Sequence, residues 1–455
     1  MRPFNSALVN EAGKLKLSAP GLHLRPKAQF MNLVEELRWR GLIQDIMPGT
    51  EDQLVKEITA GYVGFDPTAD SLHIGSLVPI LVLVHLQKAG HRPIVLVGGA
   101  TGMVGDPSGK SAERNLLSEE VLQKNLAGIR NQLEKHLDFN PSHPNAAIVV
   151  NNYDWFKNIG FIDFLRDVGK HITINYMMAK DSVKKRIEGE SGLSYTEFAY
   201  QLMQGYDFYW LYQHNQCKLQ MGGSDQWGNI TTGTELIRRK AGGEAFAFTW
   251  PLLTKADGGK FGKTEQGNVW LDPEKTSPYQ FYQFWLNAAD TDAEKWIRIF
   301  TFLPQAEILE LIEEHHKDPA KRILQKKLAA ELTRFLHGEE EFNKAVETTE
   351  KLFSRQHVPA ESLSLEDLES MEGIVHVHFE RGKLQQGIDV VSFLAETSIF
   401  PSKGEARKML LNGRVSINRQ KVVAIADLVT EDQLLHQKYL LVQKGKKNYF
   451  LVEAK

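Results

Sequence analysis

Residues 62–76 combine a strand-like run with residue types that could bind a nucleotide. The strand ends in a turn, and Asp70 or Ser71 can cap a helix that starts at about residue 72. Unpaired amides at a helix start favour bound phosphate, and the helix dipole adds to this attraction. His73 could donate to a phosphate whose charge changes during a reaction, and Gly75 leaves room for a flat base. Taken alone, an N-cap beside a surface histidine explains the segment better.

A glycine-rich loop follows the next strand-like run, within GGATGMVGDPSGKSAER at 98–114. A P-loop would need glycine at position 104, where the chain has Val104, and the spacing G-x-G-x-x-G is also absent. What remains is a loop that carries Asp106, Lys110 and Arg114. The two cations suit an anion, and the carboxylate suits an ammonium group. A flexible turn with solvated charges is the alternative, but we favour binding.

Tyr200, Gln204 and Asp207 lie at positions i, i+4 and i+7, so they share one face of a predicted helix. A polar face with aromatic neighbours is suited to line a pocket for a small polar ligand with an aromatic body. The turn GGSDQWGN then presents Asp225, whose carboxylate could bind ribose hydroxyls, and Gln226. A helix of mixed exposure followed by an ordinary turn fits these residues about equally well.

A second glycine-rich stretch at 254–268 surrounds Lys260 and Lys263. Two lysines three residues apart on a mobile loop can close over a polyphosphate and neutralise charge in the transition state. Such a stretch in isolation is more often an exposed basic turn.

Composition limits the class of protein. The 455 residues are 42% hydrophobic and 24% charged, which excludes disordered, collagen-like and disulfide-scaffold classes. Cys217 is the single cysteine and cannot form an intrachain disulfide. No apolar run approaches the roughly 20 residues that span a bilayer. Residues 1–30 are basic and poor in acids, and we expect a disordered N-terminal extension rather than a transit peptide. The expected location is the cytoplasm, without membrane contact.

The elements that must position these residues change type along the chain. Strand-like runs alternate with helical patterns over 31–270, which is typical of a parallel α/β sheet whose ligands lie beyond the carboxyl ends of its strands. Ser277-Pro278 then begins a helical region. The predicted divisions are an extension at 1–30, an α/β domain at 31–277, an α-helical domain at 278–355, a linker at 356–387 and a small α/β module at 388–455.

Charge is distributed unevenly between these parts. Residues 402–455 carry eleven lysines and arginines against five acidic residues, a net charge of +6, which leaves −9 on the preceding 401 residues. A basic module on an acidic body is the pattern expected for contact with nucleic acid. On charge alone, a solvated basic face is equally consistent.

Together the four segments, in this order, resemble a class I aminoacyl-tRNA synthetase of the bacterial tyrosyl type. HIGS at 73–76 is similar to the HIGH motif of that class, and KFGKT at 260–264 is similar to its KMSKS loop. The similarity runs from about 31 to 350, and the basic tail resembles an S4 RNA-binding domain at about 388–455. The resemblance implies a Rossmann-like catalytic domain, a helical anticodon-side domain and the S4-like domain.

The resemblance also implies a role for each matching residue. In the tyrosine site, the phenolic hydroxyl would be bound by Tyr62 and Asp207. The ammonium group would be bound by Asp106, Tyr200 and Gln204, with Asn151 and Gln226 nearby. At ATP they are Asp66, Thr68, His73, Gly75, Ser76, Gly223, Asp225, Lys260 and Lys263. Catalytic roles fall to Thr68, His73, Lys110, Arg114, Lys260 and Lys263. Contacts with tRNA are expected from Arg407, Lys408, Arg414, Arg419 and Lys421.

The implied reaction needs no nucleophile from the protein. The carboxylate of tyrosine would displace pyrophosphate from the α-phosphorus of ATP, and the tyrosyl group would then pass to the terminal ribose of tRNA(Tyr). The protein would align the reactants and stabilise charge. Mg²⁺ would come with the phosphates of ATP, and no protein-bound metal is expected. The family also implies a homodimer, with tRNA spanning both subunits.

Ser76 departs from the family pattern, because histidine or asparagine is usual at that position. Three other interpretations are weighed against the resemblance. An RNA-binding protein that kept the fold without the chemistry would be expected to lose some of the intact site residues. A P-loop kinase is disfavoured by the glycine spacing. A tryptophan-specific relative is disfavoured by the pair Tyr62 and Asp207 and by the basic tail.

Overall fold

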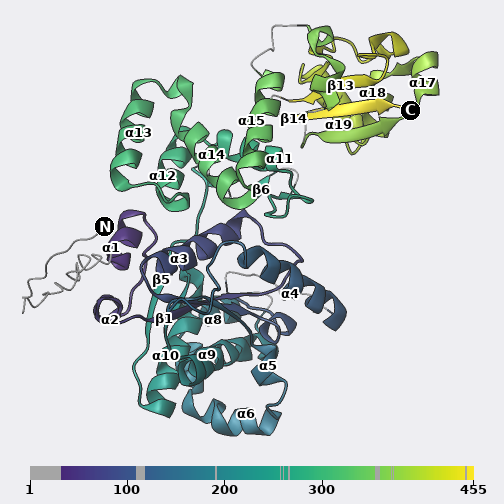
Figure 1. The fold of residues 1–455 in the computed structure, drawn as a ribbon. Helices are drawn as coiled ribbons and strands as arrows, with labels where there is room; N and C mark the ends of the chain where they lie inside the picture. Colours follow the sequence, from purple (N-terminus) through teal and green to yellow (C-terminus); the bar gives the residue numbers. More distant parts are fainter. Residues whose placement is uncertain are drawn as a thin grey trace, which may run out of the picture.

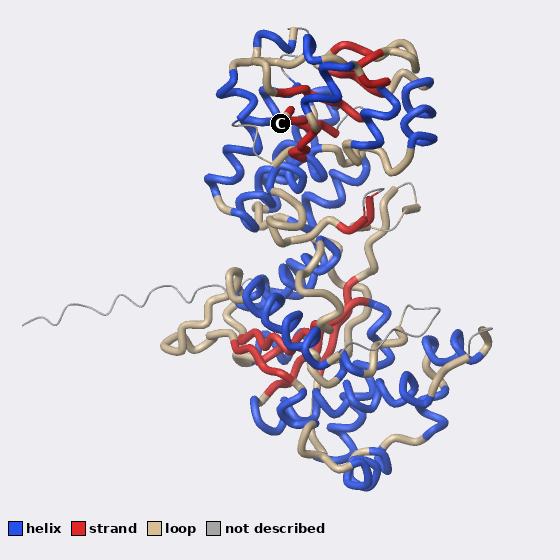
Figure 2. Tube along the Cα trace, turned by 90° about the vertical axis from the view of Figure 1, so that its right-hand side faces the viewer, coloured by secondary structure: helices blue, strands red, loops and turns tan. Residues whose placement is uncertain are grey.

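The structure is a computed structural model that describes residues 32–108, 118–189, 192–256, 258–259, 261–264, 267–353, 359–369, 371, 373–445 and 448–455. The extension expected at 1–30 lies outside the described residues. Figure 1 shows an α/β body, a group of helices above it, and a module of strands and helices that carries the C-terminal end. Most of the strands form two separate groups, one in the body and one in this module, and a short hairpin lies between them (Figure 2).

Five parallel strands form the sheet of the body, in the order β3-β2-β1-β4-β5. Their bounds are β1 (Ala60–Phe65), β2 (Arg92–Val97), β3 (Ile148–Asn151), β4 (Cys217–Gly223) and β5 (Phe246–Trp250). The chain winds from β1 to β3 on one side and continues with β4 and β5 on the other, so the winding reverses between β1 and β4. Ligands of such sheets bind beyond the carboxyl ends of the strands at this point. The predicted parallel α/β sheet is confirmed.

Successive strand residues face opposite sides of the sheet, and each side packs against different helices. Val63 and Val95 belong to the core that contains α3 and α4, whereas Tyr62 and Ile94 belong to the core that contains α9 and α10. The helices of the body are α1 (Leu33–Trp39), α2 (Thr50–Lys56), α3 (Leu77–Lys88), α4 (Glu119–Leu133), α5 (Tyr153–Phe156), α6 (Phe161–Asp167), α7 (Ile174–Met178), α8 (Asp181–Ile187), α9 (Tyr195–Asn215) and α10 (Trp227–Ala241).

The helix that we expected from about residue 72 begins later, so this prediction is wrong. The N–H of Ile74 donates to the carbonyl of Val269 (2.9 Å), and the N–H of Leu271 donates to the carbonyl of Leu72 (2.8 Å). These long-range bonds hold residues 72–74 in an extended conformation. A short 3₁₀ turn, Ile74–Ser76, therefore precedes α3, and neither Asp70 nor Ser71 caps a helix.

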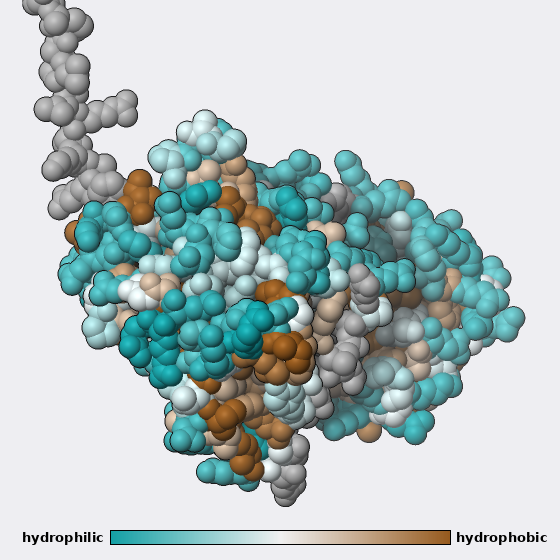
Figure 3. Space-filling view, turned by 90° about the horizontal axis from the view of Figure 1, so that it is seen from below, coloured by the Kyte–Doolittle hydropathy of each residue, from teal (hydrophilic) through white to brown (hydrophobic). Residues whose placement is uncertain are grey.

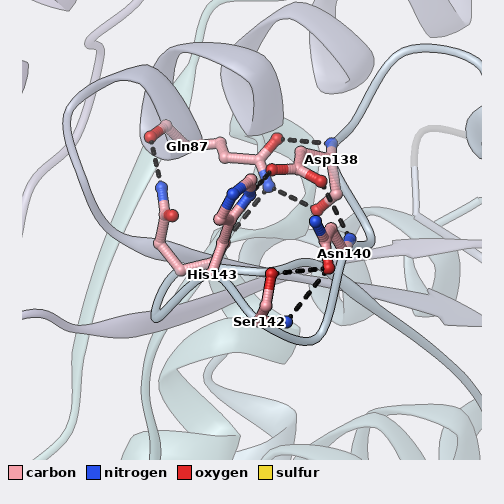
Figure 4. A network of polar contacts seen from close by, with 6 residues as sticks. Gln87, Asp138, Asn140, Ser142 and His143 are labelled. Carbon is pink, nitrogen blue, oxygen red and sulfur yellow. Dashed lines mark hydrogen bonds and ion pairs between the residues drawn. The ribbon is translucent and has the colours of Figure 1, made fainter.

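A polar network fixes the loop that leads from α4 into β3 (Figure 4). The amide of Gln87, at the end of α3, donates to the carbonyl of Asp138 (2.8 Å) and accepts from the N–H of Asp138 (2.9 Å). Asp138 and Asn140 in turn accept backbone N–H groups within the loop. These bonds fix the loop that precedes β3 against the end of α3. They thereby help to position β3 and the residues that follow it.

The expected helical domain begins at Ser277, which forms a capping box with Gln280 ahead of Pro278. The signal that predicted this start was local and is confirmed. The helices of this domain are α11 (Pro278–Leu286), α12 (Asp290–Phe300), α13 (Gln305–Lys317), α14 (Ile323–His337) and α15 (Glu339–Phe353). A two-stranded hairpin, β6 (Lys263–Thr264) and β7 (Gly267–Asn268), precedes it.

The C-terminal module contains a five-stranded mixed sheet in the order β11-β10-β13-β14-β8. Its strands are β8 (Val375–Phe379), β10 (Val415–Ile417), β11 (Gln420–Lys421), β13 (Tyr439–Lys444) and β14 (Asn448–Ala454), and β9 (Ile388–Asp389) pairs separately with β12 (Leu428–Val429). Its helices are α17 (Arg381–Gln386), α18 (Val390–Glu396) and α19 (Lys403–Leu411), and α16 (Leu365–Glu369) precedes β8.

Part of the expected linker at 356–387 belongs to this sheet. β8 lies within that range and pairs in parallel with β14, with Val375 opposite Phe450. A linker was therefore the wrong interpretation for residues 375–379. The pairing joins residues about 75 positions apart, which no local pattern could reveal.

Arg40 joins the first helix of the body to the helical domain. Its guanidinium is 3% exposed and donates to the backbone carbonyls of Arg298 (2.8 Å), Thr301 (2.6 Å) and Leu303 (2.8 Å). It also donates to the carboxylate of Glu36 (2.7 Å). One side chain thus satisfies carbonyls at the end of α12 that would otherwise be buried without donors.

Replacing Arg40 with methionine tests this junction. We expect R40M to lower the free energy of unfolding by about 3 kcal/mol, because buried carbonyls lose their donors. Thermal and urea denaturation would measure the loss. Arg38→Met is the matched control on the same helix, since Arg38 is exposed and 3.5 Å from Glu51. An equal effect of both substitutions would contradict the assigned role of Arg40.

Candidate active site

A cavity of about 210 Å³ opens at the carboxyl ends of β1 and β4, where the winding of the sheet reverses. The structure brings most of the predicted tyrosine-binding residues together there. The cavity wall includes Tyr62, Asp66, Asp106, Tyr200, Gln204, Asp207, Gly223 and Gln226. The shared face predicted for Tyr200, Gln204 and Asp207 is therefore observed.

The start of α9 is held firmly, and this orients that face. Ser194 and Glu197 form a capping box at its first turn. The carboxylate of Glu197 also receives two hydrogen bonds from the guanidinium of Arg186, both 2.8 Å long, in an ion pair that is almost fully buried. α8 and α9 are locked together by this pair.

Asp207 lies at the buried end of the cavity with only 2% of its surface exposed. The indole N–H of Trp155 donates to its Oδ1 (2.9 Å), and the amide of Asn152 donates to its Oδ2 (3.1 Å). Burial raises the pKa of Asp207 to about 8, and these two hydrogen bonds act in the opposite direction. The carboxyl group is thus positioned by donors from the segment that follows β3.

Tyr62 lies beside Asp207, and its hydroxyl is buried without a hydrogen-bond partner among the described residues. Burial raises the pKa of Tyr62 well above its usual value, and the charge of Asp207 adds to the effect. A buried hydroxyl without a partner is costly unless a ligand supplies one. The hydroxyl and the carboxyl group together form a site for a ligand hydroxyl that can both accept and donate.

Two further carboxylates, those of Asp66 and Asp106, line the cavity. Asp106 accepts from the amide of Gln226 (2.6 Å) and from the backbone N–H of Ser108 (2.9 Å). Asp66 accepts from the hydroxyl of Tyr200 (2.9 Å) and from that of Thr101 (2.9 Å). Two acidic groups in one polar wall suit a cationic ligand group such as an ammonium.

The predicted role of Asn151 is not supported by its contacts. Its side-chain oxygen accepts from the N–H groups of Gly99 (3.2 Å) and Tyr153 (3.0 Å), and it is absent from the cavity wall. The neighbouring residue, Asn152, holds Asp207 instead. Asn152 also accepts from the N–H of Ala100 (2.7 Å), so it links the segment after β3 to the loop after β2.

Sequence reasoning missed Thr101, which lines the cavity, and also Asn152 and Trp155, which are not in its wall but donate to Asp207. Asn152 donates to the hydroxyl of Thr101 (3.0 Å), which in turn donates to Asp66. A continuous hydrogen-bonded path therefore runs from Asp207 to Asp66. The signal that could have found these residues is the segment NNYDW, since an amide and an indole after a strand end are both available as donors.

His73 lies on the extended segment ahead of α3 and is not among the residues that line the cavity. Its ring Nδ1 accepts from the N–H of Gly75 (3.0 Å), which places the proton on Nε2. A side chain at position 75 would begin 2.7 Å from Cε1 of that ring, so glycine is required there. His73 is thus prepared to donate from Nε2. Thr68 is exposed, and Ser76 is half-buried.

Gly223 and Asp225 lie at the end of β4. A side chain at position 223 would begin 2.6 Å from a carboxylate oxygen of Asp225, so glycine allows that carboxylate to lie against the backbone. Predicted residues Lys110, Arg114 and Lys260 lie outside the described residues, and for Lys263 only the backbone is described, in β6. Their positions at the site remain predictions.

The predicted RNA-binding residues differ in exposure. Arg407 and Lys408 on α19, and Arg414 and Lys421 near β10 and β11, are exposed. Arg419 is half-buried, and its guanidinium donates to the carbonyl of Lys351 at the end of α15 (2.8 Å). Arg419 therefore contacts the helical domain.

Family models and known proteins match most of the chain. Residues 56–354 match the model described as tRNA synthetases class I (W and Y), and residues 369–452 match the model for the tyrosine--tRNA ligase SYY-like C-terminal domain. The tyrosine--tRNA ligase of Bacteroides fragilis is 59% identical over 430 residues, which are 93% of this chain and all of that protein. That of Porphyromonas gingivalis is 60% identical over 429 residues, 93% of this chain and 99% of its own length.

A solved structure agrees with these matches. The C-terminally truncated mitochondrial tyrosyl-tRNA synthetase of Aspergillus nidulans superposes on this structure with a TM-score of 0.63 and is 33% identical in sequence. The superposition covers 71% of this chain and 94% of the Aspergillus nidulans chain. The chain belongs to the class I tRNA synthetases of the tryptophan and tyrosine group. Within that group its activity is that of the tyrosine–tRNA ligases: it activates L-tyrosine with ATP and transfers the tyrosine to tRNA.

Removing one donor to Asp207 tests how the buried end of the cavity works. We expect Trp155→Phe to raise the KM for tyrosine several-fold, because it removes one of the two donors that hold the carboxyl group of Asp207, and a hydrogen bond contributes about 0.5–1.5 kcal/mol. The loss should be larger at pH 7 than at pH 9, because without that donor the pKa of Asp207 rises further and more of the carboxyl is protonated at neutral pH.

Trp210→Phe is the matched control, since the ring of Trp210 stacks on Trp155 at 4.2 Å and, among the described residues, its indole forms no hydrogen bond with Asp207. Steady-state adenylation rates at both pH values would measure the effects. If W210F changed the KM as much as W155F, packing rather than the hydrogen bond would be responsible.

Proposed function

We propose that the cavity binds tyrosine with its phenolic hydroxyl between Tyr62 and Asp207. The hydroxyl of Tyr62 donates to the substrate oxygen, and the substrate hydroxyl donates to Asp207. The observation that carries this proposal is the buried hydroxyl of Tyr62, which has no partner among the described residues and lies beside a carboxyl group. Phenylalanine would leave the hydroxyl of Tyr62 without a partner and would offer no hydroxyl donor to Asp207, and tyrosyl-tRNA synthetases are themselves the standard case of such discrimination.

The ammonium group of tyrosine then lies towards Asp106, Tyr200 and Gln204, with Gln226 nearby. Asp106 is already oriented by Gln226 and Ser108. This orientation directs the substrate carboxylate towards His73 and Asp225, where we place the phosphates and the ribose of ATP. Asp66, Thr68, Gly75, Ser76 and Gly223 complete the proposed nucleotide site.

The first chemical step is attack by the carboxylate of tyrosine on the α-phosphorus of ATP. A bond forms between the carboxylate oxygen and phosphorus, and the bond to pyrophosphate breaks. Nε2–H of His73 donates to the phosphate as its charge changes, and Lys110, Arg114, Lys260 and Lys263 neutralise the leaving pyrophosphate. Alignment of two bound substrates supplies the remainder of the acceleration.

We infer that ATP enters as its Mg²⁺ complex, with the ion on phosphate oxygens. Within the described part of the chain, no group of three or more His, Cys, Asp or Glu side chains is placed to hold a metal ion. None of the described helices is long and apolar enough to span a membrane. The location we propose is the cytoplasm, where tRNA is charged.

Transfer to tRNA(Tyr) follows, and we assign contacts with the RNA to the basic surface of the C-terminal module. Arg407, Lys408, Arg414 and Lys421 are exposed on it. Lysine and arginine side chains of this kind bind phosphates without reading sequence. Arg419, through its bond to Lys351, is better explained as a contact between domains.

An exposed apolar surface supports a homodimer. Phe161, Ile162 and Leu165 on α6 and Ile174 and Met178 on α7 are all exposed. Figure 3 shows apolar side chains gathered on the lower side of the molecule, where α6 lies in Figure 1. An exposed patch of large apolar residues indicates an interface, and a second copy of this chain is the partner we propose, with tRNA spanning both subunits.

Pyrophosphate–ATP exchange without tRNA tests the adenylation site. We expect exchange with tyrosine only, and a large loss of exchange in Tyr62→Phe and Asp207→Asn. Tyr62→Phe removes a donor to the substrate oxygen, and Asp207→Asn replaces an acceptor oxygen with an NH2 group beside the donors Asn152 and Trp155. Phenylalanine and tryptophan are the comparison substrates. Exchange with tryptophan would contradict the proposed pocket, and no exchange with any of the three would favour an RNA-binding protein without this chemistry.

A charge on the apolar surface tests the dimer. We expect Ile162→Asp to convert the protein to monomers, because the carboxylate would be buried without a partner at the interface. Sedimentation velocity would report the change. Val55→Asp on α2 is the control, since both residues are 71% exposed in the single chain. A wild-type protein that sediments as a monomer would remove the basis for the dimer.

A further inference from the structure

The sheet of the C-terminal module packs against different parts of the chain on its two faces. Successive strand residues face opposite sides of a sheet. One set of buried residues packs with the module's own helices, α17 to α19: Leu440, Val442, Phe450 and Val452. The alternating set belongs to the core of the body and the helical domain: Tyr439, Leu441, Tyr449 and Leu451. The ring of Tyr449 also lies 5.4 Å from that of Phe353, at the end of α15. The module therefore shares a hydrophobic core with the helical domain.

The segment that joins these two parts is buried in the shared core. Its described residues are 359–369, 371, 373 and 374, and we call them the junction segment. Four of its apolar side chains are 0% exposed: Ala360, Leu363, Leu368 and Met371. At its end, the hydroxyl of Ser277, in the cap of α11, donates to the carbonyl of Gly373 (2.7 Å). Segments between domains that move independently are exposed and make few contacts, so this one indicates a fixed junction.

Arg419 lies in a turn position that usually holds glycine. Asn418 and Arg419 alone connect β10 to β11, with φ values of +48° and +64°. A two-residue hairpin turn of this kind favours the sequence Asn-Gly, because a side chain is strained in the left-handed region. Such strain at an arginine indicates a role for its side chain.

The side chain of Arg419 holds the end of α15. Its guanidinium donates to the carbonyl of Lys351 (2.8 Å), which lies in the last turn of that helix. The carbonyls of a last turn have no partner within the helix, and a cation there also interacts favourably with the helix dipole. Asn418 fixes the turn within the module, since its side chain accepts from the N–H of Leu441 (2.9 Å) and donates to the carbonyl of Gln433 (2.5 Å). Arg419 therefore connects a rigid turn to the helical domain.

His436 repeats this arrangement at a second point. It also has a positive φ, +50°. Nε2 of its ring lies 2.7 Å from the carbonyl oxygen of Leu363 in the junction segment, so that nitrogen is the donor. Lys438, two residues later, forms an ion pair with Glu369 (3.0 Å). Two strained residues of the module, Arg419 and His436, thus each donate to a backbone carbonyl outside it.

We propose that the C-terminal module is fixed to the helical domain in the protein without tRNA, and that Arg419 and His436 are positioning residues for the transfer step. They hold the basic surface of the module in one orientation, so that tRNA bound to it also reaches the cavity of the body. The helical domain joins the module to the body (Figure 1). The assignment rests on the proposed role of that basic surface in binding tRNA.

The physical basis is the cost of immobilising a domain. A module on a flexible tether loses orientational freedom each time tRNA binds to it and to the body together, and this loss weakens binding. A module that is fixed during folding has already lost this freedom. Loosening the junction should therefore weaken the binding of tRNA in the transfer reaction and leave adenylation, which needs no tRNA, unchanged.

Hydrogen exchange in the full-length protein without tRNA tests whether the module is fixed. We expect slow exchange in peptides that cover the junction segment, where the N–H of Leu363 donates to the carbonyl of Ala360 (3.0 Å) in a buried turn. Arg419→Met should accelerate this exchange about fivefold, because one hydrogen bond across the junction is lost. Arg414→Met is the matched control, since it removes the same charge from an exposed position and should leave the exchange unchanged.

Kinetics of the same variants test the positioning role. We expect R419M to raise the KM for tRNA in aminoacylation about fivefold, with the rate of pyrophosphate–ATP exchange within about twofold of wild type. Arg419→Lys should recover most of the loss, because lysine can donate to the same carbonyl. His436→Ala should act like R419M in both measurements and is the alternative if R419M folds poorly. His376→Ala, at an exposed position on β8, is its control.

Several results would overturn the proposal. Exchange in the junction segment as fast as in an unfolded peptide, or accelerated as much by R414M as by R419M, would remove the fixed position. A normal KM for tRNA in R419M despite faster exchange, or an equal loss of adenylation, would remove the positioning role. The role of the basic surface fails separately: an unchanged KM for tRNA in both R414M and Lys408→Met would contradict it, while hydrogen exchange would still decide whether the module is fixed.

Discussion

A carboxyl group buried at the end of a pocket is the constraint on which this site depends. Asp207 could not remain there as an acceptor without donors, because an unpartnered buried carboxylate costs several kcal/mol. Asn152 and Trp155 supply them, and both follow the end of β3. The position of β3 in the sheet therefore determines how Asp207 is held, although no residue of β3 itself lines the cavity.

The same requirement extends to neighbouring elements. Asn152 is also bonded to Ala100 and Thr101, so the loop after β2 must lie beside the segment after β3. α9 must present Asp207 to both, and the buried pair of Arg186 and Glu197 holds its start. The pocket in which we propose that a substrate hydroxyl binds is in this way assembled from a strand, two loops and a helix.

Features set by local periodicity were predictable from the sequence, and features set by distant pairing were not. The face of α9 and the cap at Ser277 follow from residues a few positions apart, and both predictions are confirmed. Which asparagine contacts Asp207, residue 151 or residue 152, depends on where β3 ends relative to the neighbouring strands. The extended conformation at 72–74 depends on residues nearly 200 positions away. Charge alone also did not show which basic residues are free to contact RNA. Arg414 and Arg419 carry the same charge, but the guanidinium of Arg419 donates to a carbonyl of the helical domain.

The strand order of the C-terminal sheet has a consequence for the growing chain. β8 pairs with β14, and each residue of β8 is synthesised about 75 residues before its partner. β13, the other neighbour of β14, is also synthesised before β14. Until β14 exists, β8 has no strand to pair with, and its backbone groups are open to other chains. The exposed side chains of His376 and His378 alternate along it and keep this unpaired strand polar on one face. The body, whose five strands are complete by Trp250, can form its sheet before β14, the strand that joins β8 to β13, has been synthesised.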